Sequence, residues 1–239
     1  MMRKVTLLLI AYATSTPSLA NTSLNKIVTP KLLGTNLRYA EHLIGSPPMR
    51  DGVDGVGVKR YFYNLNGCSV FIGSKDDKVV SVGAYISEKN DCDIDVSEIV
   101  NKQNTMASTT ILSDYAHRGD LHFTNTNIPS CNACREGEFN AIIDGVGALN
   151  YTDIRLISKE TNQWDKFNQY LYSSGMDGDA RMALPMDGNS CPLRKYDGIG
   201  YKLLSNSKVI GIEFGRFGSL QPQCNGEAVH ELNLRHDYL

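Results

Sequence analysis

The sequence lacks both a long hydrophobic run and a strong charge of either sign. No stretch of about 18 consecutive apolar residues occurs in the 239-residue chain, so we expect no membrane-spanning helix. The formal net charge is -2, which gives no general attraction to nucleic acid or to anionic lipid. The hydrophobic content of 41% is that of a globular protein, and a chain of this length can bury a core without needing cysteines in order to fold.

Sequence motifs of catalysis are also absent. The chain contains no Gly-x-Ser-x-Gly and no His-Glu-x-x-His segment. Gly145 and Gly147 lack the third glycine and the helix start of a nucleotide-binding loop, so they favour a bend or bulge in a strand instead. We therefore expect no cofactor, and the sequence favours a binding protein over an enzyme.

Residues 1–20 have the order of a secretory signal peptide. Arg3 and Lys4 precede a short apolar stretch, and small and polar residues follow as far as Ala20. About eight apolar residues are too few to cross a bilayer, and this order is the one that the export machinery recognises. Asn21 rather than Cys follows the expected cleavage site, so no lipid anchor is indicated. We expect a soluble mature protein that is periplasmic or secreted.

The six cysteines all lie in the part that would be exported, where disulfides are favoured over free thiols. Six cysteines permit 15 pairings, and sequence alone does not choose among them. Spacing favours the sequential set, because Cys68 and Cys92 flank an apparent hairpin that antiparallel pairing would close. The sequential pairs are Cys68 with Cys92, Cys131 with Cys134, and Cys191 with Cys224.

The Cys131-Asn132-Ala133-Cys134 segment has two further interpretations besides a small structural disulfide. Redox catalysis would require a helix to begin at the first thiol, whereas the flanking residues are typical of a loop. A zinc site would require two more ligands. Acidic and histidine side chains lie just upstream, so the alternative metal site, which would serve a metal-dependent hydrolase or a zinc-binding protein, comprises Asp114, His117, Asp120, His122, Cys131 and Cys134.

The hydrophobic pattern predicts an α+β protein with antiparallel sheets packed against short helices. Thr35 or Asn36 can cap a helix that ends at Gly45, and three strand-like runs follow at 58–63, 69–72 and 79–86. In the remainder, the pattern predicts a short helix that Asp95 can cap and that runs toward Asn104, strands at 121–123 and within 140–158, a helix from 162 to 175 that contains Trp164, Phe167 and Leu171, and a last strand at 209–214. Residues 196–204 fit a helix and a strand equally.

Sliding the chain by 130 residues places Lys78–Val82 over Lys208–Ile212 and Gly45 over Gly175. This offset suggests two related helix-then-sheet lobes joined by a strand-rich middle. We therefore expect a signal peptide over 1–20, an N-terminal helix-plus-meander lobe over 21–104, and a strand-rich middle with a C-terminal α+β lobe over 105–239.

The segments Leu43-Ile44-Gly45-Ser46-Pro47, Gly67-Cys68-Ser69-Val70 and Lys78–Val82, in this order, carry a family resemblance. Over about residues 35–92 the chain resembles the helix-then-meander repeat of β-lactamase inhibitory proteins and of small outer-membrane assembly lipoproteins. Its C-terminal half, with Cys131 to Cys134 and Cys191, is similar to uncharacterised exported proteobacterial proteins. The segment from about 105 to 160 has no counterpart in that repeat. The resemblance implies a fold rather than the inhibition of a particular enzyme.

We therefore expect an exported, soluble binding or inhibitor-like protein of the bacterial cell envelope. Its partner would be another protein of the envelope or exterior, and the sequence does not indicate an oligomeric state. Tyrosine is plentiful, with 12 residues in the chain, and it supplies a large amphipathic contact area at low entropic cost. The predicted contact surface on the first meander comprises Tyr61, Tyr63 and Tyr85, for which ordinary sheet packing is the alternative.

Overall fold

The computed structural model describes residues 23–53, 57–87, 92–125, 137–149, 151–176 and 191–220. The expected signal peptide, Cys131, Cys134 and Cys224 lie outside these residues. The described strands are β1 (Arg50–Val53), β2 (Lys59–Leu65), β3 (Cys68–Lys75), β4 (Lys78–Tyr85), β5 (His122–Asn125), β6 (Glu138–Val146), β7 (Thr152–Lys159) and β8 (Val209–Arg216).

Short helices connect these strands. The α-helices are α1 (Leu24–Ile27), α2 (Leu37–Ile44), α3 (Ser97–Val100), α4 (Thr161–Ser173) and α6 (Asp197–Leu204). The 3₁₀ helices are η1 (Pro30–Leu32), η3 (Ala107–Thr109), η4 (Leu112–Arg118), η5 (Gly147–Leu149) and η6 (Cys191–Tyr196). This composition confirms the predicted α+β class.

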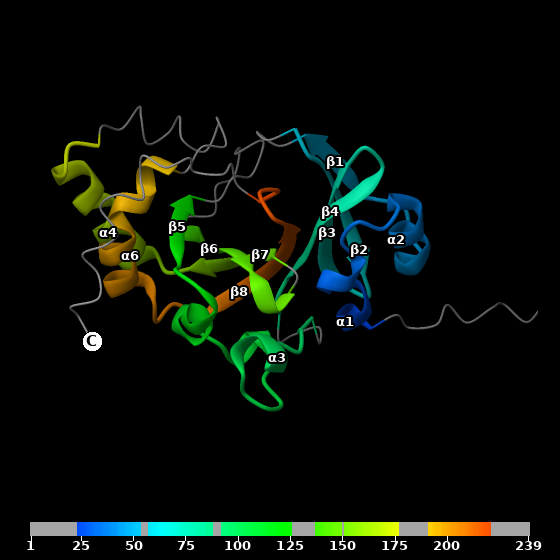
Figure 1. Cartoon of the computed structure of the whole chain (residues 1–239), viewed down its shortest axis with the longest axis horizontal. Coiled ribbons are helices and arrows are strands. Elements are labelled where there is room, and N and C mark those ends of the chain that lie inside the picture. The colour runs from blue at the N-terminus through cyan, green and yellow to red at the C-terminus, as the bar shows by residue number, and fades with distance from the viewer. Residues whose placement is uncertain are drawn as a thin grey trace, which may run out of the picture.

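The described strands form one eight-stranded sheet in the order β1-β2-β3-β4-β8-β7-β6-β5, and every neighbouring pair is antiparallel. Strands β1–β4 form one half of the sheet and β5–β8 the other (Figure 1). The halves are joined by five residue pairs between β4 and β8, from Ser81 with Gly215 to Tyr85 with Gly211. The expected lobe boundary after residue 104 falls in a turn between the two halves.

One face of the sheet is apolar and carries the main core. Helices α1 and α2 lie beside the first half, and α4 and α6 lie beside the second (Figure 1). Buried side chains of both halves form one continuous cluster across this face, including Tyr63, Val82, Ile212, Leu156 and Phe123. The halves therefore share a core as well as a sheet.

Local sequence signals account for most of the predicted elements. The Asn36 side chain accepts a hydrogen bond from the Arg38 N–H, and Gly45 ends α2 with a left-handed φ of 73°, which glycine adopts without steric cost. Trp164, Phe167 and Leu171 are buried on α4 as their spacing predicts. The α3 helix is shorter than expected, because Asn101 takes a left-handed conformation directly after Val100.

The structure shows the conformation of two segments for which the sequence left alternatives open. The register of β6 against β7 shifts between Ile143 and Val146, so the bulge expected near Gly145 is confirmed. Residues 197–204 are helical, and the Asp197 side chain at the start of α6 accepts a hydrogen bond from the Phe123 N–H at 3.1 Å. That contact ties the segment to β5.

The Cys68–Cys92 disulfide is confirmed, with its Cα atoms 5.3 Å apart. Cys191 is also disulfide-bonded. The pairing of Cys131, Cys134 and Cys224 lies outside the described residues, so the other two predicted bridges stay predictions. The resemblance to the inhibitory-protein repeat also stays a prediction. Between α2 and β4 the chain forms three strands, whereas between α4 and β8 the described residues form η6 and α6.

Candidate binding site

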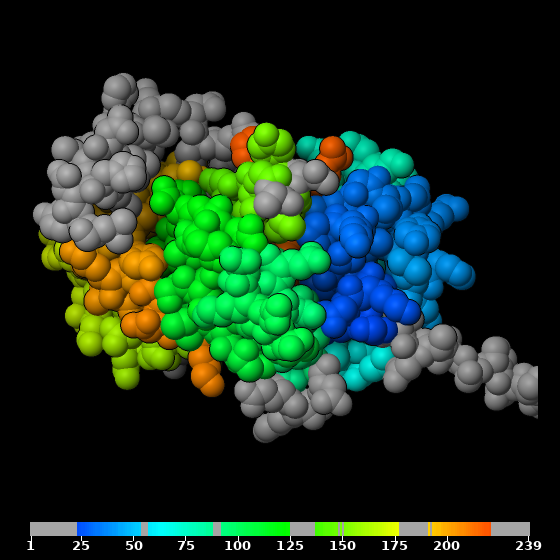
Figure 2. Space-filling view, turned by 60° about the horizontal axis from the view of Figure 1, so that its bottom comes forward, coloured from blue at the N-terminus to red at the C-terminus, as the bar shows by residue number. Residues whose placement is uncertain are grey.

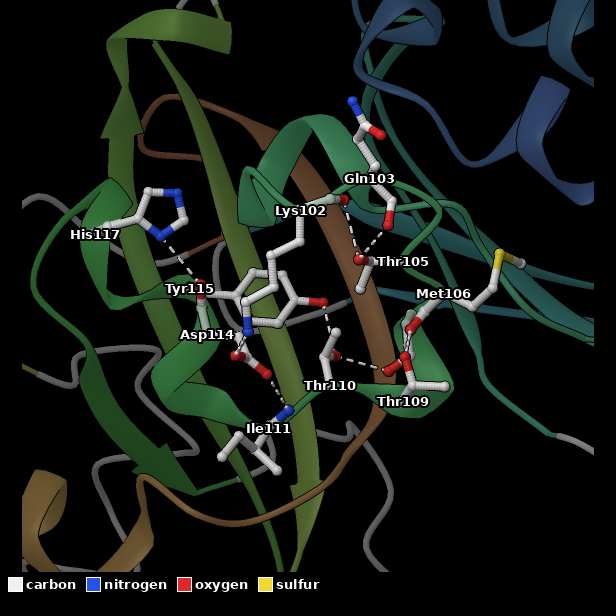
Figure 3. A network of polar contacts seen from close by, with 11 residues as sticks. Lys102, Gln103, Thr105, Met106, Thr109, Thr110, Ile111, Asp114, Tyr115 and His117 are labelled. Carbon is white, nitrogen blue, oxygen red and sulfur yellow. Dashed lines mark hydrogen bonds and ion pairs between the residues drawn. The ribbon is translucent and has the colours of Figure 1, made fainter.

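The predicted Asp/His cluster is divided between separate environments. On η4, Asp114 forms an ion pair with Lys102 at 2.5 Å and accepts a hydrogen bond from the Ile111 N–H at 3.0 Å. The His117 Nδ1 lies 3.0 Å from the Asp114 carbonyl oxygen and faces away from the Asp114 carboxylate (Figure 3). Burial acts to raise the pKa of Asp114, but the Ile111 N–H and Lys102 outweigh it and hold that pKa below its usual value.

The other two described members of the predicted metal site also lie apart from this pair. Asp120 is exposed, and His122 is buried on β5. Within the described ranges, no group of three or more His, Cys, Asp or Glu side chains is placed to hold a metal ion. The two remaining members, Cys131 and Cys134, lie outside those ranges, so the complete set stays a prediction.

His122 instead belongs to a polar network that the sequence did not reveal. Its Nδ1 lies 2.6 Å from the Asp197 Oδ2 on α6, and its Nε2 lies 3.2 Å from the Arg194 Nη1 on η6. Arg194 also donates to the Asp144 Oδ2 on β6. The side chains of His122 and Asp197 are 11% and 4% exposed, so this network fastens η6 and α6 to the edge of the sheet.

The geometry of this network favours one tautomer of His122. With the proton on Nδ1, the ring donates to Asp197, and Nε2 accepts from Arg194. Burial raises the pKa of Asp197, and the hydrogen bond from His122 acts in the opposite direction. The sequence could not indicate these contacts, because Asp197 lies 75 positions from His122.

The three predicted contact tyrosines do not share a face of the sheet. Tyr63 is fully buried on the apolar face, and its hydroxyl lies 3.4 Å from the Glu41 carboxylate. Tyr85 points to the opposite face, where its ring packs edge-on against Phe71 at 5.9 Å. Because Tyr61 and Tyr85 are only half-buried, these two retain accessible surface, whereas Tyr63 has none to offer a partner.

The second face of the sheet carries buried charge. Glu213 on β8 is fully buried between Arg60 of β2 at 2.5 Å and Arg155 of β7 at 2.6 Å. Burial acts to raise the pKa of Glu213, but the attraction of the two arginines outweighs it and holds that pKa below its usual value. Arg155 also donates to the Leu220 carbonyl, so the three ions connect both half-sheets with the segment after β8.

A cavity of about 510 Å³ lies where the N-terminal residues meet the second half of the sheet. We call it the seam pocket. In Figure 2 the blue N-terminal residues border the green residues around α3 and η4, with yellow-green residues above the border. The pocket is lined by Thr29, Pro30, Lys31, Leu33, Glu98, Leu149, Tyr151, Thr152, Arg216 and Phe217.

Two aromatic residues of the seam pocket are mostly exposed. Tyr151 is 69% exposed and Phe217 is 55% exposed. Tyr151 also has a φ of 56°, a left-handed conformation that bulky side chains rarely adopt and that costs about 1–3 kcal/mol. Exposed aromatics and a strained backbone are features that cluster at binding sites.

The charges of the seam pocket are mixed, with Lys31 and Arg216 on two walls and Glu98 on a third. All three side chains are exposed. Sequence reasoning missed this site because its walls come from η1, α3, β7 and the end of β8. The one local signal was the pair Gly145 and Gly147, which indicated a bend or bulge in a strand but no pocket.

No helix in the described part of the chain is long and apolar enough to cross a membrane. Searches for related sequences gave no matching family model and no matching curated protein. Two solved structures align with this chain at low similarity. One is a cysteine-rich secretory protein from Staphylococcus aureus, with 12% identity and a TM-score of 0.33 over 78% of this chain.

The second is an extracellular protein containing an SCP domain from Bacillus anthracis, with 8% identity and a TM-score of 0.35 over 90% of this chain. The chain spans about half the length of both structures, since the alignments cover 45% and 50% of them. TM-scores this low do not establish a shared fold. The two alignments therefore assign this chain to no family.

Proposed function

We propose that this chain is an exported binding protein that contacts another protein of the cell envelope or exterior through the seam pocket. Export is supported by the signal-like order of residues 1–20 and by the Cys68–Cys92 disulfide, since disulfides persist in oxidising compartments. The observation that carries the binding role is the pair of exposed aromatic residues, Tyr151 and Phe217, at a cavity.

The composition of the pocket favours a protein partner. Aromatic residues and arginine are the side chains that most often dominate protein–protein binding energy, and Tyr151, Phe217 and Arg216 lie together here. Lys31 and Glu98 add charges of opposite sign, which suit a mixed polar surface and set orientation more than affinity. The pocket would receive one anchoring side chain while its surroundings form the rim.

Site-specific photo-crosslinking in the producing cells tests this proposal. A photoreactive phenylalanine at position 151 or 217 should give an adduct of the same discrete mass, and Arg216→Glu should remove that adduct. Tyr172 on α4 and Tyr201 on α6 are matched control positions, because they are 51% and 42% exposed away from the pocket. Equal crosslinking at all four positions, or none at 151 and 217, would contradict the proposal.

Acid–base chemistry at His122 is the second candidate, and the 2.6 Å contact with Asp197 favours it. A carboxylate on Nδ1 is the arrangement that orients a histidine to act as a base through Nε2. In this structure Arg194 lies 3.2 Å from that nitrogen, so catalysis would require Arg194 to move.

Hydrolysis of a panel of chromogenic esters tests this candidate. We expect a hydrolase to lose its activity in His122→Asn and to keep it in His117→Asn, because His117 is exposed on η4 and lies outside the network. Equal activity in the two variants would exclude His122 as the catalytic base.

A further inference from the structure

Asp153 connects two segments of the chain that adjoin residues of the seam pocket. It lies near the start of β7 and is 1% exposed. One carboxylate oxygen accepts a hydrogen bond from the Gly145 N–H of β6, and the other accepts one from the Gly218 N–H after β8, both at 2.8 Å. A single carboxylate therefore bridges the two strands that flank β7.

Both bonded amides belong to segments that position the exposed aromatics. Gly218 directly follows Phe217, and the Phe217 ring lies over Gly145, where a Cβ atom would stand 3.0 Å from it. On the other side, the Tyr151 N–H donates to the Val146 carbonyl at 3.1 Å. Tyr151 and Phe217 thus line neighbouring walls of the pocket, and Asp153 fastens the segments next to them to each other.

The charges around Asp153 leave it weakly compensated. Burial raises the pKa of Asp153 to about 6, the two glycine N–H groups lower it, Asp144 on β6 raises it, and Arg155 on β7 lowers it. Arg155 is engaged by Glu213 of β8, and Asp144 by Arg194 of η6. The residue opposite Asp153 on β8 is Gly215, which brings no charge.

We propose that Asp153 is a pH-operated clamp on the seam pocket: its carboxylate holds the two walls together, and uptake of a proton releases one of them. An ionised carboxylate accepts hydrogen bonds at both oxygens, whereas a protonated one has an O–H that is a donor and a poor acceptor. One of the two glycine amides therefore loses its partner in acid. The regulatory meaning of the clamp rests on the proposed binding function, whereas the clamp itself does not.

Amide hydrogen exchange measured by NMR on the free mature chain tests the clamp directly. Between about pH 7.5 and pH 5, the protection factor of the Gly145 or the Gly218 amide should fall at least about tenfold, since a hydrogen bond to a charged group is lost. The Gly67 amide is a matched control, because it donates to the Asn64 side-chain oxygen at 2.7 Å. The side-chain carboxamide of Asn64 does not titrate between these pH values. Parallel behaviour of all three amides would refute the clamp.

The Asp153→Asn variant provides an independent check. Its one carbonyl oxygen can hold only one of the two glycine amides, so the other should be unprotected at every pH between 5 and 7.5 (about the range of the titration). If this variant does not fold, the pH dependence of amide exchange in the unmodified chain still tests the clamp. Hydrogen exchange is measured on the free chain, without a binding partner. If the exchange experiment shows the expected loss of protection but positions 151 and 217 give no crosslinked adduct, the proposed binding function is rejected and the clamp is retained.

Discussion

Replacement of Glu213 by Gln should strongly destabilise the protein. Glu213 is fully buried between Arg60 and Arg155, and the side chains of both arginines are 8% exposed. Glutamine keeps the size of the side chain but removes its charge, so two buried guanidinium groups lose the anion that compensates them. Removing one partner of a buried ion pair costs about 3–5 kcal/mol.

Thermal and urea unfolding measure this loss. A change of about 3–5 kcal/mol in the free energy of unfolding lowers Tm by roughly 6–20 °C for a chain of this size. The Glu98→Gln variant is a matched control, because Glu98 is exposed on α3 and the same chemical change there should cost less than about 0.5 kcal/mol.

The pH dependence of stability gives a second measure of the same interaction. The pKa of Glu213 is held below its usual value in the folded protein, so its contribution is present above the unfolded pKa and is lost as the pH falls through the folded pKa. Glu213→Gln should therefore flatten the acid side of the stability profile. A loss below about 1 kcal/mol, with an unchanged acid profile, would refute the view that the two arginines depend on this carboxylate.

Three further predictions concern separate parts of the fold. Replacing Cys68 and Cys92 by Ala should cost about 3–4 kcal/mol in urea unfolding, because the bridge closes a loop with a sequence separation of 24. As a control, a reducing agent should lower the stability of the variant by less than it lowers that of the parent chain, and an equal drop in both would contradict this role of the bridge. Gly200→Ala should destabilise α6 by about 1–2 kcal/mol despite the better helix propensity of alanine, because the new Cβ would lie 2.6 Å from the Phe123 ring; a raised Tm would contradict this packing. Tyr151→Asn should leave the free energy of unfolding unchanged or raise it by up to about 1 kcal/mol, because asparagine tolerates the left-handed conformation better. The same substitution should weaken the crosslink from position 217. A large loss of stability would show that Tyr151 stabilises the fold instead of binding a partner.

The sequence predicted the elements whose signals are local. Asn36 and Gly45 mark the two ends of α2, and the spacing of Trp164, Phe167 and Leu171 marks the buried side of α4. These signals act within one or two turns of the chain, so they can be read without knowledge of the fold.

The seam pocket and the buried Arg60–Glu213 ion pair could not be predicted because each joins distant segments of the chain. Arg60 and Glu213 lie 153 positions apart, and nothing near either residue indicates a buried partner. Residues 196–204 fitted both periodicities, and the contact that ties α6 to β5, from the Phe123 N–H to Asp197, spans a separation of 74. The sequence indicated His122 as a metal ligand or an acid–base residue, whereas the partners given for it above, Asp197 and Arg194, come from two other elements.

The strand order also has a consequence for the time course of folding. The strand that closes the sheet, β8, is the last described strand in the chain, yet it lies at the centre between β4 and β7. Until residues 209–216 are synthesised, β4 and β7 each present an unpaired edge, and such edges template aggregation. The two half-sheets can therefore join only after β8 has been synthesised, and a truncation before residue 209 should give two separate, aggregation-prone pieces of sheet rather than a shortened protein.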